Sequence, residues 1–328
     1  MELVECVPNV SEGRRPETIA HIVAAARAVP GVRVLDVHSD AVHHRSVLTY
    51  VAPPEAALEA GFAVAREAVR RIDLREHVGV HPRIGALDVF PFVPLGAVHM
   101  ARCVELAHAL GRRIAAELET PVYYYGEAAL SEDRRQLEQV RGKGFEALRE
   151  AIAHDPRRAP DAGPSRIHPS AGATAVGARE VLIAFNVYLG TADVALAQRV
   201  ARRLRASSGG LRYVKALGLD VSSASGASGA SGASGASGAS AGTDRGLVET
   251  QVSLNLTDYR RSSLVAVMDL TRAEAARHGV AVTRSEVVGL LPLAAVLDAA
   301  AAFLQLDDLS GARVLEQRLW SHDDGGDE

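Results

Sequence analysis

The sequence is short of the residues that mark several classes of protein. Aromatic residues make up only 4% of the 328 residues, which argues against stacking platforms for single-stranded nucleic acid. Cys6 and Cys103 are too few for a disulfide framework or a cysteine zinc site, and they fit a reducing cytoplasm. A net charge of −4 gives no general attraction to nucleic acid. We therefore expect small-molecule partners and no nucleic acid.

Long apolar runs are missing as well. No stretch approaches the roughly 18 apolar residues that a membrane span needs. The opening MELVECVPNVSEG has no basic region followed by an apolar core, so we expect no signal peptide and a cytoplasmic location without membrane binding. With 48% hydrophobic and 23% charged residues, the composition is that of a globular protein. A length of 328 residues predicts two domains or two lobes.

Hydrophobic periodicity predicts one order of elements in both halves: strand, helix, strand, strand, helix, strand. In the first half we expect strands at 3–8, 32–37, 46–51, 88–93 and 122–125, and helices after Pro16, at 55–72 and near 97–118, with a charged helix following. In the second half we expect strands at 180–189, 211–219, 247–256 and 280–288, and helices up to Leu204 from an N-cap at Thr191, at 260–278 and at 292–303.

This repeated order is that of the ferredoxin-like motif, whose sheet keeps one bare face unless something covers it. We therefore predict an α/β (α+β) fold of two ferredoxin-like βαββαβ lobes that cover each other across a cleft. Between two strands of the second half, the Ser/Gly/Ala run 222–242 cannot build a core and is predicted to be a disordered insert. The acidic tail 323–328 is predicted to be disordered too.

The stretch HVGVHPRIGALDVFPFVP, residues 77–94, concentrates groups that can carry chemistry at a loop-to-strand junction. His81 precedes Pro82, which disfavours helix and keeps its backbone extended. An imidazole there can take and return a proton near neutral pH. Arg83 offers a planar fork for a carboxylate. The alternative is that His81 and Asp88 only satisfy backbone groups of the loop.

A second cluster is DVHSDAVHHR, residues 36–45, at the end of a predicted strand. Its histidines and aspartates could bind a divalent metal, but their spacing matches no known metal signature. Substrate binding is the better interpretation, with Arg45 pairing a carboxylate and Asp36 or Asp40 orienting a histidine. A third segment, GPSRIHPSAGATAVGAR at 163–179, is rich in turn residues, and its backbone donors could hold a flat heterocycle or simply connect the lobes.

Together these segments resemble one known family. The runs VECVPNVSEG, HPRIGALDVFPF, YYYGEAA, GPSRIHPSAGATAVGAR, LIAFNVYL and VGLLPL occur in order along nearly the whole chain outside the Ser/Gly/Ala run. They are similar to glutamate formimidoyltransferase, and HPRIGALDVFPF is the most specific of them.

The resemblance implies a formiminotransferase unit of two subdomains, residues 1–180 and 181–328, whose sheets face each other across a substrate tunnel. It implies transfer of the formimino group of N-formiminoglutamate to N5 of tetrahydrofolate as co-substrate, a step of histidine degradation. It also implies a homodimer and no metal. His81 matches the family's catalytic histidine, and Asp40 is our second catalytic candidate. The expected substrate and folate contacts are Arg45 and Arg83 together with Gly163, Pro164, Ser165, Arg166, Ile167, His168, Pro169, Ser170, Ala171 and Gly172.

Two positions depart from the family pattern. Some members carry a carboxylate where this chain has His38, and members often have Asn-Arg where it has His44-Arg45. Three alternatives stay open: formyl transfer from N-formylglutamate on the same scaffold, a folate-binding protein without catalysis, and a metal-dependent hydrolase.

Overall fold

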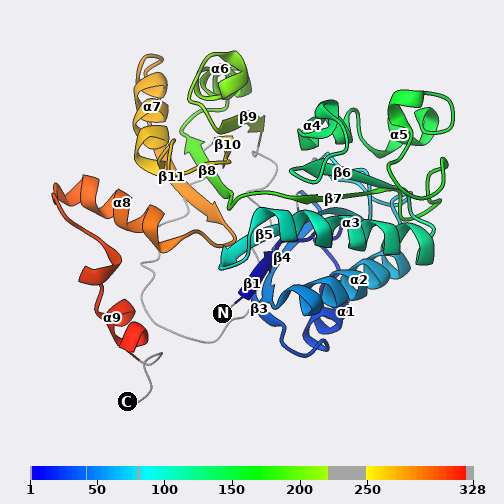
Figure 1. Cartoon of the computed structure of the whole chain (residues 1–328). Coiled ribbons are helices and arrows are strands. Elements are labelled where there is room, and N and C mark those ends of the chain that lie inside the picture. Colours follow the sequence, from blue (N-terminus) through cyan, green and yellow to red (C-terminus); the bar gives the residue numbers. More distant parts are fainter. Residues whose placement is uncertain (1, 42, 80–81, 221–248, 323–328) are drawn as a thin grey trace. The chain divides into compact units, whose positions relative to one another are not determined.

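The computed structural model describes residues 2–41, 43–79, 82–220 and 249–322 (Figure 1). By its internal contacts the chain divides into two compact units, Met1–Val181 and Leu182–Glu328. Each unit has its own sheet and its own hydrophobic core. The predicted mixed α/β fold with two sheets is therefore confirmed. The predicted insert 222–242, the tail 323–328 and His81 lie outside the described residues.

The first unit alternates strands and helices along the chain. Its strands are β1 (Glu2–Cys6), β2 (Asn9–Val10), β3 (Arg33–Asp40), β4 (Arg45–Ala52), β5 (Leu87–Gly96), β6 (Val122–Gly126) and β7 (Thr174–Ala178). Its helices are α1 (Pro16–Arg27), α2 (Pro54–Arg71), α3 (Met100–Glu117), α4 (Leu137–Arg141) and α5 (Phe145–Ala151). Both α1 and α2 begin with proline, which suits the first helical turn because no N–H is needed there.

These strands form one sheet in which β4 is flanked by β3 on one side and by β1 and β2 on the other. Strand β5 pairs antiparallel with β1 and β2, and parallel with β7, which in turn pairs parallel with β6. The sequence places the strand of this region wrongly. We expected a strand from Glu180 onward, but Thr174–Ala178 is a separate strand between β5 and β6, and the next strand starts only at Ile183.

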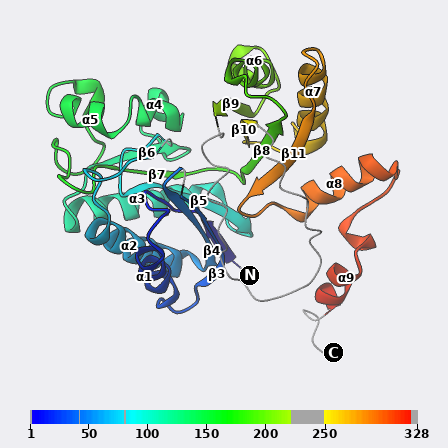
Figure 2. The same ribbon diagram turned by 180° about the vertical axis from the view of Figure 1, so that it is seen from behind.

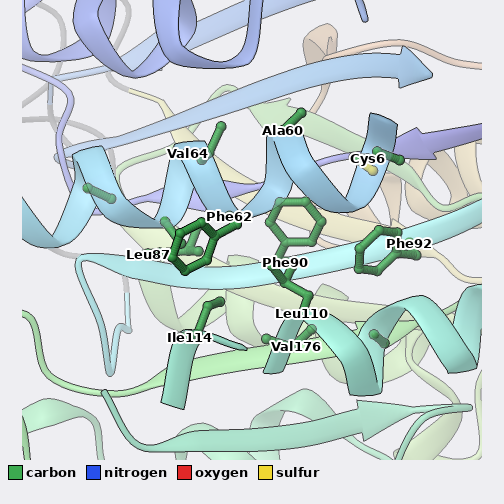
Figure 3. Close-up of a cluster of buried hydrophobic side chains, with 14 of the residues drawn as sticks. Cys6, Ala60, Phe62, Val64, Leu87, Phe90, Phe92, Leu110, Ile114 and Val176 are labelled. Carbon is green, nitrogen blue, oxygen red and sulfur yellow. The ribbon is translucent and has the colours of Figure 1, made fainter. Parts of the chain in front are cut away.

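Helices α1, α2 and α3 cover one face of this sheet, whereas α4 and α5 lie on the other face, over β5, β7 and β6 (Figure 2). The main core lies on the side of the three long helices. Figure 3 shows Phe90 of β5 between Ala60 of α2 and Leu110 of α3. Gly61 is needed there, since a Cβ would stand 2.8 Å from the Phe90 ring.

From Ile183 to Val288 the second unit has the predicted order of strand, helix, strand, strand, helix and strand. It contains β8 (Ile183–Leu189), α6 (Val194–Leu204), β9 (Val214–Asp220), β10 (Thr250–Leu256), α7 (Leu264–Ala276), β11 (Val282–Val288), α8 (Leu293–Leu304) and α9 (Leu315–His322). The sheet order is β11-β8-β10-β9, and all its pairs are antiparallel. Helices α6 and α7 pack on one face of this sheet (Figure 1).

Helix starts in the second unit differ from the sequence prediction. Asp193, not Thr191, is the N-cap of α6, because its carboxylate accepts from the Leu196 amide at 3.0 Å. Helix α7 begins after Ser263 rather than at Arg260, and the Ser263 hydroxyl accepts from the Ala266 amide. Among the described helices, none has the length and apolar character needed to cross a membrane.

The core of the first unit offers a matched pair of leucines. Leu110 is fully buried, whereas Leu130 is 61% exposed. We predict that Leu110→Ala lowers the free energy of unfolding by about 2–5 kcal/mol, because it leaves a cavity beside Phe90. Leu130→Ala should change it by less than about 0.5 kcal/mol. Urea unfolding of both variants checks this, and equal losses would contradict the assignment of the core.

Candidate active site

Charged residues collect on the face of the first sheet that α1, α2 and α3 leave uncovered. Along β4, Leu48, Tyr50 and Ala52 belong to the core, so Arg45 and the other odd-numbered residues point to the opposite face. Asp40, the last residue of β3, lies directly across from Arg45 in the antiparallel register. The hairpin end thus brings two of the predicted site residues together.

Arg45 stands in a charged environment that extends beyond the hairpin. Burial lowers its pKa to about 10, and the nearby Arg141 guanidinium acts in the same direction. The carboxylates of Asp88 and Asp40 oppose that shift. Arg141 donates to Asp88 Oδ2 from Nε at 3.1 Å and from Nη2 at 2.5 Å. Two arginines and two aspartates therefore act on one another in a partly desolvated place.

Asp88 ties this cluster to the predicted catalytic loop. Its side chain is 2% exposed and its Oδ1 accepts from the Ile84 amide at 2.8 Å. Asp88 thus bonds a backbone group of the loop, as the alternative interpretation proposed for it, and its carboxylate also binds Arg141, which the sequence analysis did not single out. In the sequence, Arg141 is marked only by its place in the charged segment that follows the strand at 122–125.

Asp40 holds the turn that follows it. Its carboxylate accepts from the His43 amide at 2.9 Å and lies 2.6 Å from His43 Nδ1. The segment before α1 packs against this turn, since a Cβ on Gly13 would stand 2.1 Å from the Asp40 carbonyl oxygen. The structure therefore gives Asp40 a positional role beside Arg45, and its catalytic role stays a prediction.

Glu12, which the sequence analysis did not single out, anchors the same segment. Its side chain is 1% exposed, and its carboxylate accepts from the amides of Arg14 and Arg15 at 2.8 and 2.9 Å and from the Arg15 guanidinium. Burial raises the pKa of Glu12, but these hydrogen bonds outweigh burial and hold the pKa below its usual value. A buried carboxylate is thereby kept ionised next to the hairpin.

Two histidine rings stack beside Glu12. The rings of His44 and His77 lie 4.2 Å apart and 7° from parallel. His44 Nε2 lies 3.2 Å from Glu12 Oε1, and His44 Nδ1 lies 3.1 Å from the Val78 carbonyl oxygen. His77 Nε2 donates to the His44 carbonyl at 2.9 Å. These contacts fix the backbone of residues 77–79 against the β3–β4 hairpin, just before the position of His81.

The Arg83 side chain is hydrogen-bonded within the same loop. Its guanidinium donates to the His77 carbonyl at 3.1 Å and to Glu146 Oε1 at 3.0 Å. Its side chain is only 12% exposed, whereas that of Glu146 is 60% exposed. Arg83 therefore stabilises the loop and α5, and its binding of a substrate carboxylate stays a prediction.

The predicted folate-binding segment 163–172 divides into a first part, residues 163–167, and a second part, residues 168–172. In the second part, His168 and Gly172 exchange two backbone hydrogen bonds of 3.1 Å, and Gly172 lies against Ile84 with a positive φ of 74°. In the first part, Arg166 faces Glu119 at 3.3 Å on the surface, with both side chains more than 70% exposed. Only the second part lies next to the loop that carries Arg83.

A metal site finds no support in the part of the chain that the structure describes. In residues 2–41, 43–79, 82–220 and 249–322, no group of three His, Cys, Asp or Glu side chains is close enough to hold a metal ion. The cluster 36–45 instead uses Asp40 and His44 to fix the hairpin. The expectation that no metal takes part stays a prediction.

Comparison with known proteins identifies the class of fold and site. A family model described as "Formiminotransferase domain, N-terminal subdomain" matches residues 3–179, and one described as "Formiminotransferase domain" matches residues 245–318. The chain therefore belongs to the formiminotransferase family.

Individual relatives extend the match over nearly the full chain. It is 41% identical to a glutamate formimidoyltransferase of Thermoplasma acidophilum, over 97% of this chain and 98% of that protein. It is 39% identical to one of Streptococcus pyogenes serotype M1, over 97% and 99%. A formimidoyltransferase-cyclodeaminase of Sus scrofa is 40% identical over 94% of this chain, which corresponds to 53% of that longer protein.

The stacked histidines predict a pH dependence of stability. Burial lowers the pKa of His77 below its ordinary 6.5, although the His44 carbonyl partly opposes this. The folded state thus disfavours the protonated ring, so stability falls as pH drops below about 6.5, where the unfolded chain binds the proton more readily. Urea unfolding at pH 7.5, 6.0 and 5.0 should show a smaller loss for His77→Gln than for the wild type.

Two controls belong to this experiment. His168, whose pKa burial also lowers, remains in the variant, so some pH dependence should persist. His21→Gln, at an exposed position on α1, should behave like the wild type. An unchanged pH dependence in His77→Gln would contradict the prediction.

Proposed function

We infer that this chain is a glutamate formimidoyltransferase, which moves the formimino group of N-formiminoglutamate to N5 of tetrahydrofolate and releases glutamate. The observation that carries this conclusion is the identity of about 40% to such enzymes over 97% of the chain. The function places the protein in histidine catabolism and folate one-carbon metabolism. Tetrahydrofolate then acts as a co-substrate that leaves carrying the group.

We propose that the cationic face around Arg45 receives a carboxylate. N-formiminoglutamate has two carboxylates, and the glutamate tail of folate has two more. The influence of Arg141 on Arg45 supports this, because neighbouring guanidiniums can bind one carboxylate through charge-assisted hydrogen bonds. Residues 168–172 border the neighbouring loop, which supports a folate contact there rather than at the surface residue Arg166.

The proposed reaction needs one acid/base residue, and we assign His81 to it. As folate N5 attacks the formimino carbon, the neutral His81 ring takes the N5 proton and a tetrahedral intermediate forms. Collapse breaks the bond between that carbon and the glutamate nitrogen, and His81 gives a proton to the leaving nitrogen. Asp40 is proposed to assist from the end of the adjacent hairpin. The fixed backbone of residues 77–79 supports the role, since it holds the chain up to the position before Val80.

The finer architecture is also proposed. The second sheet has the strand order β11-β8-β10-β9 with antiparallel pairs, which supports a ferredoxin-like lobe. The matches to residues 3–179 and 245–318 support subdomains at 1–180 and 181–328. The tunnel between the sheets, the homodimer, the cytoplasmic location and the absence of a metal stay predictions.

One assay tests the function against its alternatives. Purified protein is incubated with tetrahydrofolate and either N-formiminoglutamate or N-formylglutamate, and the absorbance spectrum of the substituted folate is followed. Product from N-formiminoglutamate supports the assignment. Product from N-formylglutamate alone would indicate formyl transfer. Folate binding without product from either donor would indicate a binding protein.

Loss of the histidine at position 81 should remove turnover and spare binding. We predict that His81→Ala lowers kcat by about 10²–10⁴-fold, the contribution typical of a general acid/base, with the Kd for tetrahydrofolate nearly unchanged. His99→Ala, at an exposed histidine before α3, is the control. Near-normal kcat in His81→Ala would reject the assignment.

Arginine substitutions should separate binding from chemistry. Arg45→Met is expected to raise KM for one substrate by about 10–100-fold, the scale of a charge-assisted hydrogen bond, with a smaller effect on kcat. Arg83→Met and Arg166→Met should also raise KM, with the least effect at Arg166, because water screens an exposed charge. A loss in kcat alone for Arg45→Met would argue against a binding role.

A further inference from the structure

The second unit contains a polar cluster that the proposed chemistry of the first unit does not use. Along β10, Val252, Leu254 and Leu256 belong to the core with α6 and α7, so Gln251 points to the face that these helices leave uncovered. Tyr188 of β8 lies directly across from Gln251 in the register. Gln251 and Tyr188 are both buried on this face, and buried polar groups are normally hydrogen-bonded.

Hydrogen bonds give this cluster a fixed polarity. Tyr188 Oη donates to Glu286 Oε2 at 2.7 Å, and Arg284 lies over the Tyr188 ring with 3.4 Å between its Cζ and the ring centre. Burial raises the pKa of Tyr188 to about 12, and Glu286 adds to the rise, so the hydroxyl keeps its proton. That proton goes to Glu286. The Tyr188 oxygen is therefore left to act as an acceptor.

This polarity decides how the Gln251 amide is turned. Gln251 Nε2 donates to the Tyr188 oxygen at 3.2 Å. The amide must be turned this way because the Tyr188 hydroxyl donates its only proton to Glu286 and can only accept from Gln251. Gln251 is 2% exposed, and its Oε1 has no hydrogen-bond partner among the residues that the structure describes. Gln251 Oε1 is thus a buried acceptor without a donor, and an N–H group that reached it would satisfy it.

The surroundings favour a flat and uncharged donor. Leu219 of β9 is the register neighbour of Gln251 on the other side, and Leu217 on the same face is 50% exposed. These leucines offer apolar contact to a ring next to the amide. A cationic amidine, as in N-formiminoglutamate, would prefer a carboxylate, and the carboxylate of this cluster, Glu286, already accepts from Tyr188 Oη. The edge of a 2-amino-4-oxopterin instead carries neutral N–H donors side by side.

We propose that Gln251 is a specificity-determining residue for the pterin ring, whose exocyclic amino group donates to Gln251 Oε1. Tyr188 is a positioning residue that holds the amide in the accepting orientation. The inference rests on the proposed function for the identity of the co-substrate, and it adds the residue that distinguishes its ring.

The test compares two ligands on matched variants by isothermal titration calorimetry of the full chain. The ligands are tetrahydrofolate and its 2-desamino-2-methyl analogue, which lacks the exocyclic donor. The wild type should prefer tetrahydrofolate. Gln251→Met should weaken tetrahydrofolate binding by about 10-fold, the scale of one neutral hydrogen bond, and leave the analogue unchanged. Ser253→Ala, two residues along the same face, should retain the preference.

Several results would overturn the proposal. They are a wild type without preference, an unchanged preference in Gln251→Met, or an equal loss of both ligands. Should Gln251→Met fail to fold, Tyr188→Phe must reduce the preference, because it removes the hydroxyl that orients the amide. The KM for N-formiminoglutamate should not change in either variant. Turnover of the wild type with N-formiminoglutamate tests the proposed function separately, since ligand preference is measured without turnover.

Discussion

The carboxylate of Asp88 holds together the parts of the first unit from which the candidate site is built. It is buried, and removing a charge from water is costly unless hydrogen bonds and an opposite charge compensate. The Ile84 amide and the Arg141 guanidinium supply that compensation. The hydrogen bond from Ile84 fixes the loop before β5. The ion pair with Arg141 holds the end of α4 on the sheet face opposite α1, α2 and α3, near Arg45.

The same contact explains why local sequence patterns predicted part of the site and not the rest. Arg45 and Arg83 stand in short runs rich in histidine, aspartate and glycine, so their composition marks them as unusual. Arg141 pairs with a residue 53 positions away. Such a pairing has no local pattern, and a charged residue in a short helix is usually solvated. Glu12 was missed for a similar reason, since its partner His44 comes from another segment.

The strands and helices were predicted well where buried residues recur with the period of a strand or a helix, and poorly where burial has no such period. Strands such as β4, with alternate residues in the core, and α2, with a continuous buried stripe, were predicted close to their bounds. Thr174–Ala178 has five small buried residues and no alternation, because both faces of β7 are covered. Its strand state comes from pairing with β5 and β6, which a local period cannot reveal.

His44 combines an unusual backbone conformation with a ring that is held on several sides. His44 has a left-handed backbone, with φ of 51°, a conformation that is uncommon outside glycine but that asparagine, aspartate and histidine adopt more often than other residues. Its ring compensates by stacking on His77 and by placing both nitrogens beside acceptors, on Glu12 and Val78. An asparagine would suit the backbone better but could not span both acceptors while stacking on a ring. The His44 ring therefore links the hairpin to the loop, while Arg45, the next residue, begins β4 and points to the face opposite α1, α2 and α3.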